Sequence, residues 1–247
     1  MTTGGTAGQP LRTFDDQGRP LTEIPMVDGV VQGLYRLWQD GRPVMDLPFV
    51  QGKPDGVGVW YDPQGRVQMR VTFVAGRKHG PAEVWQNGHL TARLTYVEDQ
   101  PDGVMTVEQA PGAPPQAEVP HQAGVPHGVA TYRSETGAVV RQEQWQAGQL
   151  HGIQQDYDPA GQVTARRGFA QGLPDGPETA YTPGTATPQR VRWWQKGILV
   201  GQQLFDARGT ELRREGKVGP APAAPAGPPS PSAFLGRLKS LMGGGDR

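Results

Sequence analysis

The apolar residues of this chain occur in short alternating runs that are separated by turns containing glycine. The runs 57–61 and 67–73 are typical, since β-branched and aromatic residues alternate there with small or polar ones, which is the pattern of strands in a β-sheet. Between residues 10 and 215 the apolar residues do not recur with the period of a helix. The pattern therefore predicts an all-β fold built from short strands.

Two interleaved ladders of glycine divide the chain into repeats. The glycines of the first ladder follow one another at intervals of 23 to 25 residues, and each is followed after eight or nine residues by a glycine of the second ladder. Two turns per repeat indicate a β-hairpin per repeat, and because an isolated hairpin is marginally stable, the hairpins must stack. The first ladder is Gly33, Gly56, Gly80, Gly103, Gly128, Gly152, Gly176 and Gly201; the second begins with Gly18, Gly41 and Gly65 and ends at Gly209.

The turn sequences predict the turn types. Asp40-Gly41 and Asn87-Gly88 supply the two positive φ angles of a type I′ hairpin turn. The other version reads Asp62-Pro-Gln-Gly65 and recurs as Asp158-Pro-Ala-Gly161, with proline at the second position of a turn and glycine in the left-handed region.

Aromatic residues fall into two columns of the repeat, one before each five-residue Gly-x-x-Asp/His-Gly frame and one after it. We expect the columns to stack into core ladders as the hairpins pack. The alternative is an aromatic face that stays open for a partner. The columns are Phe49, Phe73, Tyr96, His121, Trp145, Phe169 and Trp194, and then Trp38, Trp60, Tyr61, Trp85, Tyr132, Tyr157, Tyr181 and Phe205.

Proline interrupts the repeats in two places. In the fourth repeat, 104–122, prolines stand where a strand needs hydrogen-bond donors, so we expect a weakened hairpin or a bulging loop that acts as a hinge or as a surface for a partner. Residues 216–231 have the Pro/Ala-rich composition of an extended linker. The predicted organisation is a flexible N-terminus over 1–9, a repeat array over 10–215, this linker, a short helix over 232–243 and a tail over 244–247.

Charge and composition exclude several classes of protein. Lys plus Arg and Asp plus Glu number 24 each, so no net field attracts nucleic acid, and we expect no nucleic-acid partner. There is no cysteine, which excludes disulfides and thiolate sites. The chain shows no signal-peptide pattern and no apolar stretch near the ~18 residues that span a membrane, so we expect a soluble, cytoplasmic protein.

The residue before the closing glycine of the frame is acidic or histidine in six repeats. Such a column resembles a metal site, but equivalent positions two strands apart lie roughly 9–10 Å from each other, whereas zinc ligands sit about 2 Å from the ion. We interpret these residues, together with the glycines that follow, as structural turn residues whose side chains bond to turn backbone. They are Asp55, His79, Asp102, His127, His151 and Asp175, followed by Gly56, Gly80, Gly103, Gly128, Gly152 and Gly176.

No motif for catalysis accompanies this column. The chain has no phosphate-binding G-x-x-x-x-G-K-[ST], no H-E-x-x-H and no G-x-S-x-G. The spaced glycines of the frames precede strands and not helices, which argues against a phosphate loop. We predict no catalytic, cofactor-binding or metal-ligating residue, and therefore a protein that is not an enzyme.

The C-terminal stretch 232–243 has the pattern of a short amphipathic helix with Ser232 as its N-cap. A helix of this length is marginal alone in water, so we expect it to fold on contact with a partner. Another protein, the chain's own sheet and a membrane are three candidate surfaces, the membrane being disfavoured by the few cations. The apolar, partner-binding side chains are Phe234, Leu235, Leu238, Leu241 and Met242.

The repeat resembles the MORN-repeat-variant family, bacterial proteins described as YwqK-type antitoxin components. The resemblance rests on Gly-x-x-His/Asp-Gly, then Trp or Tyr, then a turn glycine, then Leu or Val, best seen over 52–67, 76–90, 148–163 and 172–181, and it covers about residues 10–215. It implies one elongated, twisted antiparallel sheet of about eight hairpins that binds other proteins and, in some members, neutralises a toxin. The proline-broken fourth repeat, Val200 before the closing glycine, and the C-terminal stretch depart from the family pattern.

These observations together predict a non-enzymatic protein-binding or scaffold protein. Its partner is an unidentified protein, and the resemblance offers a toxin as one candidate, since some members of that family neutralise toxins. The alternative is a module that associates with a glycan or a membrane through exposed aromatic residues or the C-terminal helix. The sequence leaves the oligomeric state open.

Overall fold

The computed structural model describes residues 8–220, and this part of the chain is all-β, as predicted. It contains no helix, so no described segment has the form of a membrane-spanning helix. Two compact units are present. The first holds the described residues up to Ala130 together with 146–148, and the second holds 131–145 and the chain from Gln149 onward.

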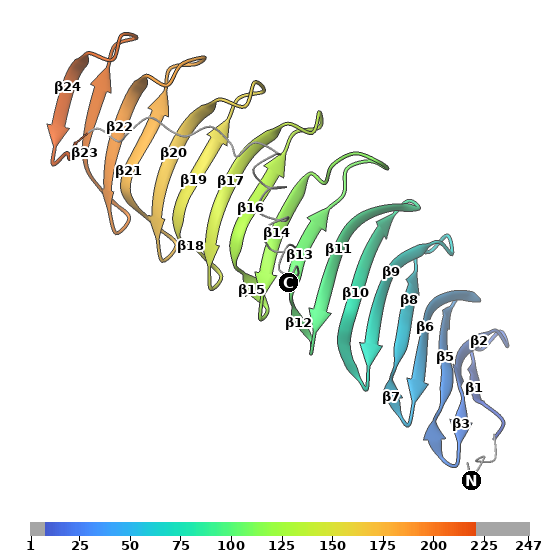
Figure 1. Cartoon of the computed structure of the whole chain (residues 1–247). Coiled ribbons are helices and arrows are strands. Elements are labelled where there is room, and N and C mark those ends of the chain that lie inside the picture. Colours follow the sequence, from blue (N-terminus) through green and yellow to red (C-terminus); the bar gives the residue numbers. More distant parts are fainter. Residues whose placement is uncertain (1–7, 221–247) are drawn as a thin grey trace, which may run out of the picture. The chain divides into compact units, whose positions relative to one another are not determined.

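The first unit is an antiparallel succession of hairpins in which each long strand pairs with the strands before and after it in the sequence (Figure 1). Only β3 and β4 form a separate two-stranded sheet among the described residues of this unit. Its strands are β1 (Leu11–Phe14), β2 (Pro20–Ile24), β3 (Met26–Val27), β4 (Val30–Val31), β5 (Gly33–Gln39), β6 (Arg42–Val50), β7 (Lys53–Pro54), β8 (Gly56–Tyr61), β9 (Val67–Val74), β10 (Arg77–Gln86), β11 (His89–Val97), β12 (Gln100–Pro101), β13 (Gly103–Val107), β14 (Ala117–Gln122) and β15 (Val125–Pro126).

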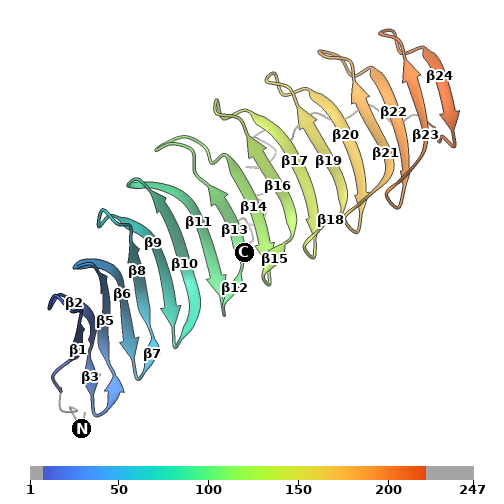
Figure 2. The same cartoon turned by 180° about the vertical axis from the view of Figure 1, so that it is seen from behind.

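The second unit repeats the arrangement, and in both views its strands lie in a single layer (Figure 2). Strand β16 (Gly128–Arg133) is divided between the units at Ala130. The remaining strands are β17 (Val139–Gln146), β18 (Gln149–Leu150), β19 (Gly152–Tyr157), β20 (Val163–Ala170), β21 (Leu173–Tyr181), β22 (Pro188–Gln195), β23 (Ile198–Phe205) and β24 (Glu211–Gly216).

The predicted turns are confirmed. Asn87 and Gly88 have φ of 53° and 81° and close the β10–β11 hairpin as a type I′ turn. Gly65 adopts φ of 78°, and its turn is held by Asp62, whose Oδ1 accepts the N–H groups of Gln64 and Arg66, each at 2.9 Å.

The first residue of each frame, which is glycine except at Asp99, also lies in a two-residue left-handed turn that the sequence did not reveal. Residues such as Gln51, Ala75 and Ala147 occupy the position before it with φ of 49°, although side chains other than Asn and Asp rarely adopt this region. The sequence signal was weak because these residues are not turn formers.

The proline-rich fourth repeat forms a hairpin as well as a loop. Strands β13 and β14 pair without interruption from Gly103↔His121 to Val107↔Ala117, and Pro120 pairs with Val104. The expected bulging loop is present over 108–116, between the two strands. The carbonyl of Pro120 accepts the N–H of His127 at 2.9 Å, so this residue still takes part in the hydrogen bonding despite its missing donor.

Each unit has a small core, because a single layer of strands cannot enclose much side-chain volume. In the first unit the buried hydrophobic residues are Val71 and Ala82, which pair across β9 and β10, and Ala130. In the second unit Tyr157, Val163 and Tyr181 form a buried cluster against which Val139 packs.

The second aromatic column does not form one ladder. Tyr132 donates its hydroxyl proton to Glu143 at 3.2 Å, whereas Tyr157 donates to Gln142 at 2.8 Å. Glu143 and Gln142 are consecutive residues of β17 and therefore point to opposite faces. The column mixes positions four and five residues after the closing glycine, and a shift of one residue exchanges the faces of a strand.

The remaining predictions concern the chain ends. The helix over 232–243, with Phe234 to Met242, and most of the linker over 216–231 lie outside the described residues, as do residues 1–7.

Candidate protein-binding surface

The six predicted turn glycines share an unusual backbone conformation. Gly56, Gly80, Gly103, Gly128, Gly152 and Gly176 have φ between 83° and 113°. At Gly56 a Cβ atom would lie 2.9 Å from Cγ of Pro48, closer than real Cβ contacts allow. Glycine is needed there both for its φ and for the close approach of the neighbouring strand.

The acidic and histidine residues of the column connect one turn to the next. Asp55 Oδ2 accepts the N–H of Ala75 at 3.0 Å, and Asp175 Oδ1 accepts the N–H of Lys196 at 3.0 Å. Asp102 and His127 make the same contact with Ala123 and Ala147, at 3.3 and 3.4 Å. In each case the acceptor holds the left-handed residue of the following repeat, which compensates for its unfavourable φ.

The two other histidines of the column have different surroundings. His79 Nδ1 lies 3.6 Å from Glu98 Oε1. The backbone N–H of His151 donates to the carbonyl of Gln144 at 2.9 Å, a bond that Asp55 and His127 also make with the facing strand. Within residues 8–220 no three His, Asp or Glu side chains are grouped so that they could hold a metal ion.

Alternation along the strands gives the first unit two chemically different faces. One face, here called the aromatic face, carries Tyr35 and Phe49, whose rings meet edge to face at 6.1 Å, and Trp60 and Phe73, whose ring centroids are 6.4 Å apart. Its middle row contains the buried Val71 and Ala82. The aromatic face therefore supplies most of the packing of this unit.

The opposite face, here called the charged face, carries a row of alternating charges across the strands. Glu23 lies between Arg12, at 2.9 Å, and Arg36, at 3.5 Å, and further along the row Arg70 lies 3.8 Å from Glu83. The arginine side chains are between 43% and 55% exposed. Exposed ion pairs contribute only about 0–1 kcal/mol each, so the row contributes little to stability and remains accessible to solvent.

Beside this row runs a row of uncharged residues, here called the uncharged strip. Cross-strand pairs define it: Leu34↔Pro48, Val57↔Thr72, Pro81↔Thr95 and Val104↔Pro120. The hydroxyl of Thr72 donates to the carbonyl of Pro81 at 3.0 Å and joins two of these pairs. Val57 and Val104 are 48% and 51% exposed. The strip thus presents apolar side chains to solvent next to a line of charges.

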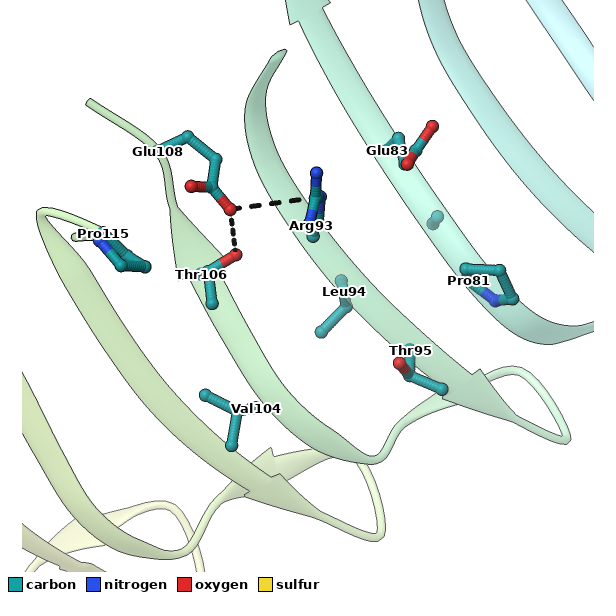
Figure 3. Close-up of a pocket in the computed structure, with 10 residues that line it drawn as sticks. Pro81, Glu83, Arg93, Leu94, Thr95, Val104, Thr106, Glu108 and Pro115 are labelled. Carbon is teal, nitrogen blue, oxygen red and sulfur yellow. Dashed lines mark hydrogen bonds and ion pairs between the residues drawn. The ribbon is translucent and has the colours of Figure 1, made fainter. Parts of the chain in front are cut away.

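The strip and the charged row meet in a depression of about 390 Å³ beside the loop 108–116 (Figure 3). Pro81 and Pro115 lie on opposite sides of it, and Val104 lies between them. Glu108 Oε1 accepts the hydroxyl proton of Thr106 at 2.8 Å and lies 4.0 Å from Nε of Arg93. The proline-rich loop thus contributes Glu108 and Pro115 to the lining of the depression.

The lining of this depression combines apolar and charged side chains. It consists of Pro81, Ala82, Glu83, Arg93, Leu94, Thr95, Val104, Thr106, Glu108 and Pro115. The only hydroxyl groups of this lining belong to Thr95 and Thr106, and that of Thr106 donates to Glu108. Apolar groups framed by charged ones are typical of protein-binding surfaces.

Equivalent repeat positions in the second unit have a different chemistry. Glu178, on the face that corresponds to the aromatic face, accepts hydrogen bonds from Arg167 at 3.0 Å and from Nε1 of Trp194 at 2.7 Å. Burial acts to raise the pKa of this carboxyl group, but the two hydrogen bonds outweigh it and hold the pKa below its ordinary value. A polar network thus replaces the apolar row of Val71 and Ala82.

Sequence reasoning did not find the uncharged strip or the depression. Their residues are valines, threonines and prolines that each look ordinary in a strand or a turn. The signal that was present is their recurrence one residue after the closing glycine, as at Val57, Pro81, Val104 and Val129.

No protein-family model matches this chain, and no curated protein sequence matches it.

Proposed function

We propose that this chain is a non-enzymatic, protein-binding repeat scaffold, and that the charged face of its first unit recognises the partner. The observation that carries the proposal is the uncharged strip, in which Val57 and Val104 are about half exposed, beside the row of charges that contains Arg70 and Glu83. Apolar contacts supply affinity in such a surface, and the charges select the partner and its register.

The shape of the site supports a partner that lies across the strands. The strip crosses from β5 to β14, and neighbouring strands are about 4.8 Å apart. The loop 108–116 borders a depression of about 390 Å³ in this surface, which is large enough for one protruding side chain. We infer that a side chain of the partner enters it between Pro81 and Pro115.

The resemblance of the repeats to MORN-repeat-variant proteins gives the proposal a more specific form, in which the partner is a toxin and the scaffold neutralises it. This form rests on the Gly-x-x-His/Asp-Gly frames and on no contact in the structure. Co-expression of the chain with an identified partner that inhibits growth tests it directly: restored growth supports neutralisation, and unchanged inhibition contradicts it.

A glycan-binding role has less support. Such sites stack sugar rings on exposed aromatic residues, and among residues 8–220 Phe14 is the only aromatic residue that is exposed, at 55%. We therefore place the proposal on protein recognition.

The Val104→Asp substitution tests the proposed surface. Because Val104 is 51% exposed, the change should leave the free energy of unfolding within about 0.5 kcal/mol. It places a charge in the strip, so we expect a partner to bind at least about ten-fold more weakly. The matched control is Val84→Asp, which is 43% exposed and lies on the aromatic face of β10.

The measurement is affinity capture from a lysate of the native host followed by titration of the purified partner. A protein that binds the wild-type chain and the Val84→Asp control, but not Val104→Asp, supports the proposal. If every captured protein binds Val104→Asp as tightly as the wild type, the charged face is not the recognition surface.

A further inference from the structure

The second unit contains a face that is deeply buried although the described strands form only one layer. Thr179, Val191 and Gln203 lie side by side on β21, β22 and β23, and their residues are 1%, 0% and 3% exposed. In the first unit the equivalent repeat positions include Glu83 and Arg93, with side chains 28% and 61% exposed. The face of Thr179, Val191 and Gln203, here called the Thr179 face, is thus shielded from solvent.

The end of the described chain turns onto this face. Gly201 lies in the row of Trp193 on the Thr179 face, and the space that a side chain of Gly201 would fill is occupied by the backbone of Lys217. Two residues later, Gly219 lies against the ring of Trp193, where its Cβ would be 2.9 Å from Cη2. From β24 the chain has therefore crossed β23 and reached β22, running across the strands.

The path of residues 217–219 follows the row that corresponds to the uncharged strip of the first unit. Trp193 stands one residue before Trp194, as Thr95 stands one residue before Tyr96, and Pro177 follows Gly176 as Pro81 follows Gly80. Pro177 pairs with Trp193 and is the next member of the row. A segment that continued in this direction would pass over β21, β20 and β19.

The Thr179 face has buried hydrogen-bond donors that lack acceptors. Nε1 of Trp193 and Nε of Arg166 are both buried without a hydrogen-bond partner, and a buried donor without an acceptor costs about 1–3 kcal/mol. Peptide carbonyl groups satisfy such donors, and a proline-rich segment supplies carbonyls while contributing few N–H groups of its own. Proline-rich segments also dock on aromatic side chains in an extended conformation.

The sequence that follows Gly219 has this chemistry and sufficient length. Residues 220–231 contain six prolines, at 220, 222, 225, 228, 229 and 231. The eleven residues 221–231 span about 34 Å at about 3.1 Å per residue, and the strands β21, β20, β19 and β17 take up roughly 19 Å at about 4.8 Å per strand. The segment is therefore long enough to cross the rest of the second unit.

We propose that residues 221–231 of the same chain, which lie outside the described residues, bind the Thr179 face of the second unit as an extended strap that continues the path of Lys217 and Gly219. The strap crosses β21, β20 and β19 and accepts hydrogen bonds from Trp193 and Arg166. This inference is independent of the function proposed for the first unit. It implies that the second unit carries its own ligand while the corresponding strip of the first unit stays open.

A spin label on the full-length chain tests the strap. The chain contains no cysteine, so Ala226→Cys gives a single site for a nitroxide. We expect selective paramagnetic broadening of the NMR signals of Gln155, Arg166 and Thr179 and unchanged signals at the equivalent first-unit positions Arg70 and Glu83. Uniform broadening, or none, contradicts the proposal.

Two further samples assign the contact. Mixing isotope-labelled chain without nitroxide with unlabelled chain carrying it should give no broadening, and broadening in that sample would show that a second copy supplies the segment. Replacing Pro222, Pro225 and Pro228 by glycine leaves residues 8–220 unchanged and should abolish the selective broadening. If the broadening persists, recognition of proline is wrong.

The donor is tested with Trp193→Phe, which keeps an aromatic ring and removes the indole N–H. Loss of one hydrogen bond should lower the ratio of docked to undocked segment by about five-fold. Trp85→Phe is the matched control, because Nε1 of Trp85 is likewise buried without a partner but belongs to the first unit. An equal effect of both substitutions, or none of either, overturns the role of Trp193.

Discussion

At the scale of the residue, the side chain before the closing glycine stabilises a backbone conformation of the following repeat at four positions, Asp55, Asp102, His127 and Asp175. Ala75 has φ of 49°, a region that costs most side chains about 1–2 kcal/mol, and its N–H is held by Asp55 Oδ2. The N–H of the following residue, Gly76, donates to the carbonyl of Pro54 at 2.7 Å. Four Asp and His residues of the column thus connect successive turns.

This role predicts the effect of changing Asp55. Asp55→Ala removes the acceptor for Ala75 N–H and should lower the free energy of unfolding by about 1 kcal/mol. Asp55→Asn keeps a side-chain oxygen at the same position and should recover most of the loss. Urea denaturation measures both values. Equal losses for Ala and Asn would show that the charge of Asp55, and not its hydrogen bond, is what matters.

At the scale of the element, the Gly-x-x-Asp/His-Gly frames lie opposite prolines that stand inside strands of the sheet. Pro48 and Pro120 lie within β6 and β14, where a missing N–H normally interrupts a ladder. Their carbonyls accept the N–H groups of Asp55 and His127, each at 2.9 Å, next to glycines whose positive φ bends the facing strand. The hairpin of the fourth repeat therefore persists where proline alone predicted weakening.

Two glycine substitutions distinguish the effect of close contact with the neighbouring strand from the effect of a positive φ alone. Gly56→Ala meets both a φ of 110° and Pro48 at 2.9 Å, so we expect a loss of about 3 kcal/mol in the free energy of unfolding. Gly65→Ala has φ of 78° and no atom within 4 Å of the new methyl group, and should cost about 1 kcal/mol. Thermal and urea unfolding of the two variants test the order, and a larger loss for Gly65→Ala would contradict it.

At the scale of the whole molecule, the two units use the same repeat for different purposes. The first packs an apolar row on its aromatic face and leaves the uncharged strip exposed. The second places Glu178, with a side chain 11% exposed, in a hydrogen-bonded network and buries the Thr179 face. Binding to a partner is therefore proposed for the first unit, and binding of the chain's own proline-rich segment for the second.

The network of Glu178 predicts a dependence of stability on pH. Because the pKa of Glu178 in the folded chain lies below its ordinary value, this group stabilises the fold above the ordinary value near pH 4.5, and the contribution is lost as the pH falls through the lowered pKa. Glu178→Gln should remove this part of the acid sensitivity. Glu178→Ala leaves Arg167 and Trp194 without their acceptor and should cost about 2 kcal/mol at neutral pH.

Hydrogen exchange measured by mass spectrometry checks both changes and their location. Faster exchange is expected in β20, β21 and β22 and not in β8 to β10, since strands of a stacked repeat contact only their neighbours. An acid sensitivity of Glu178→Gln equal to that of the wild type would contradict the assignment to this carboxyl group.

Much of the fold could be predicted because it depends on local rules. The glycine intervals, the Asn87-Gly88 turn and the Asp62 turn each specify a backbone conformation from a few consecutive residues, so hairpins and their order follow from the sequence. The binding surface could not be predicted in this way. Val57, Thr72 and Pro81 are far apart in the sequence, and only the strand register brings them into one row.

The sequence by itself determined the all-β class, the hairpin repeat and its turns, because glycine, proline, Asn and Asp control φ within a few residues. The tertiary structure alone decided which side chains share a face. Tyr132 and Tyr157 contact Glu143 and Gln142, which are consecutive residues that point to opposite faces of β17. Because side chains alternate between the two faces, a shift of one residue exchanges the faces without changing the composition of the strand. It also decided that Lys217 and Gly219 turn back over Gly201 and Trp193. No pattern of neighbouring residues specifies this contact, because it joins residues of different strands and depends on the direction that the chain takes after β24.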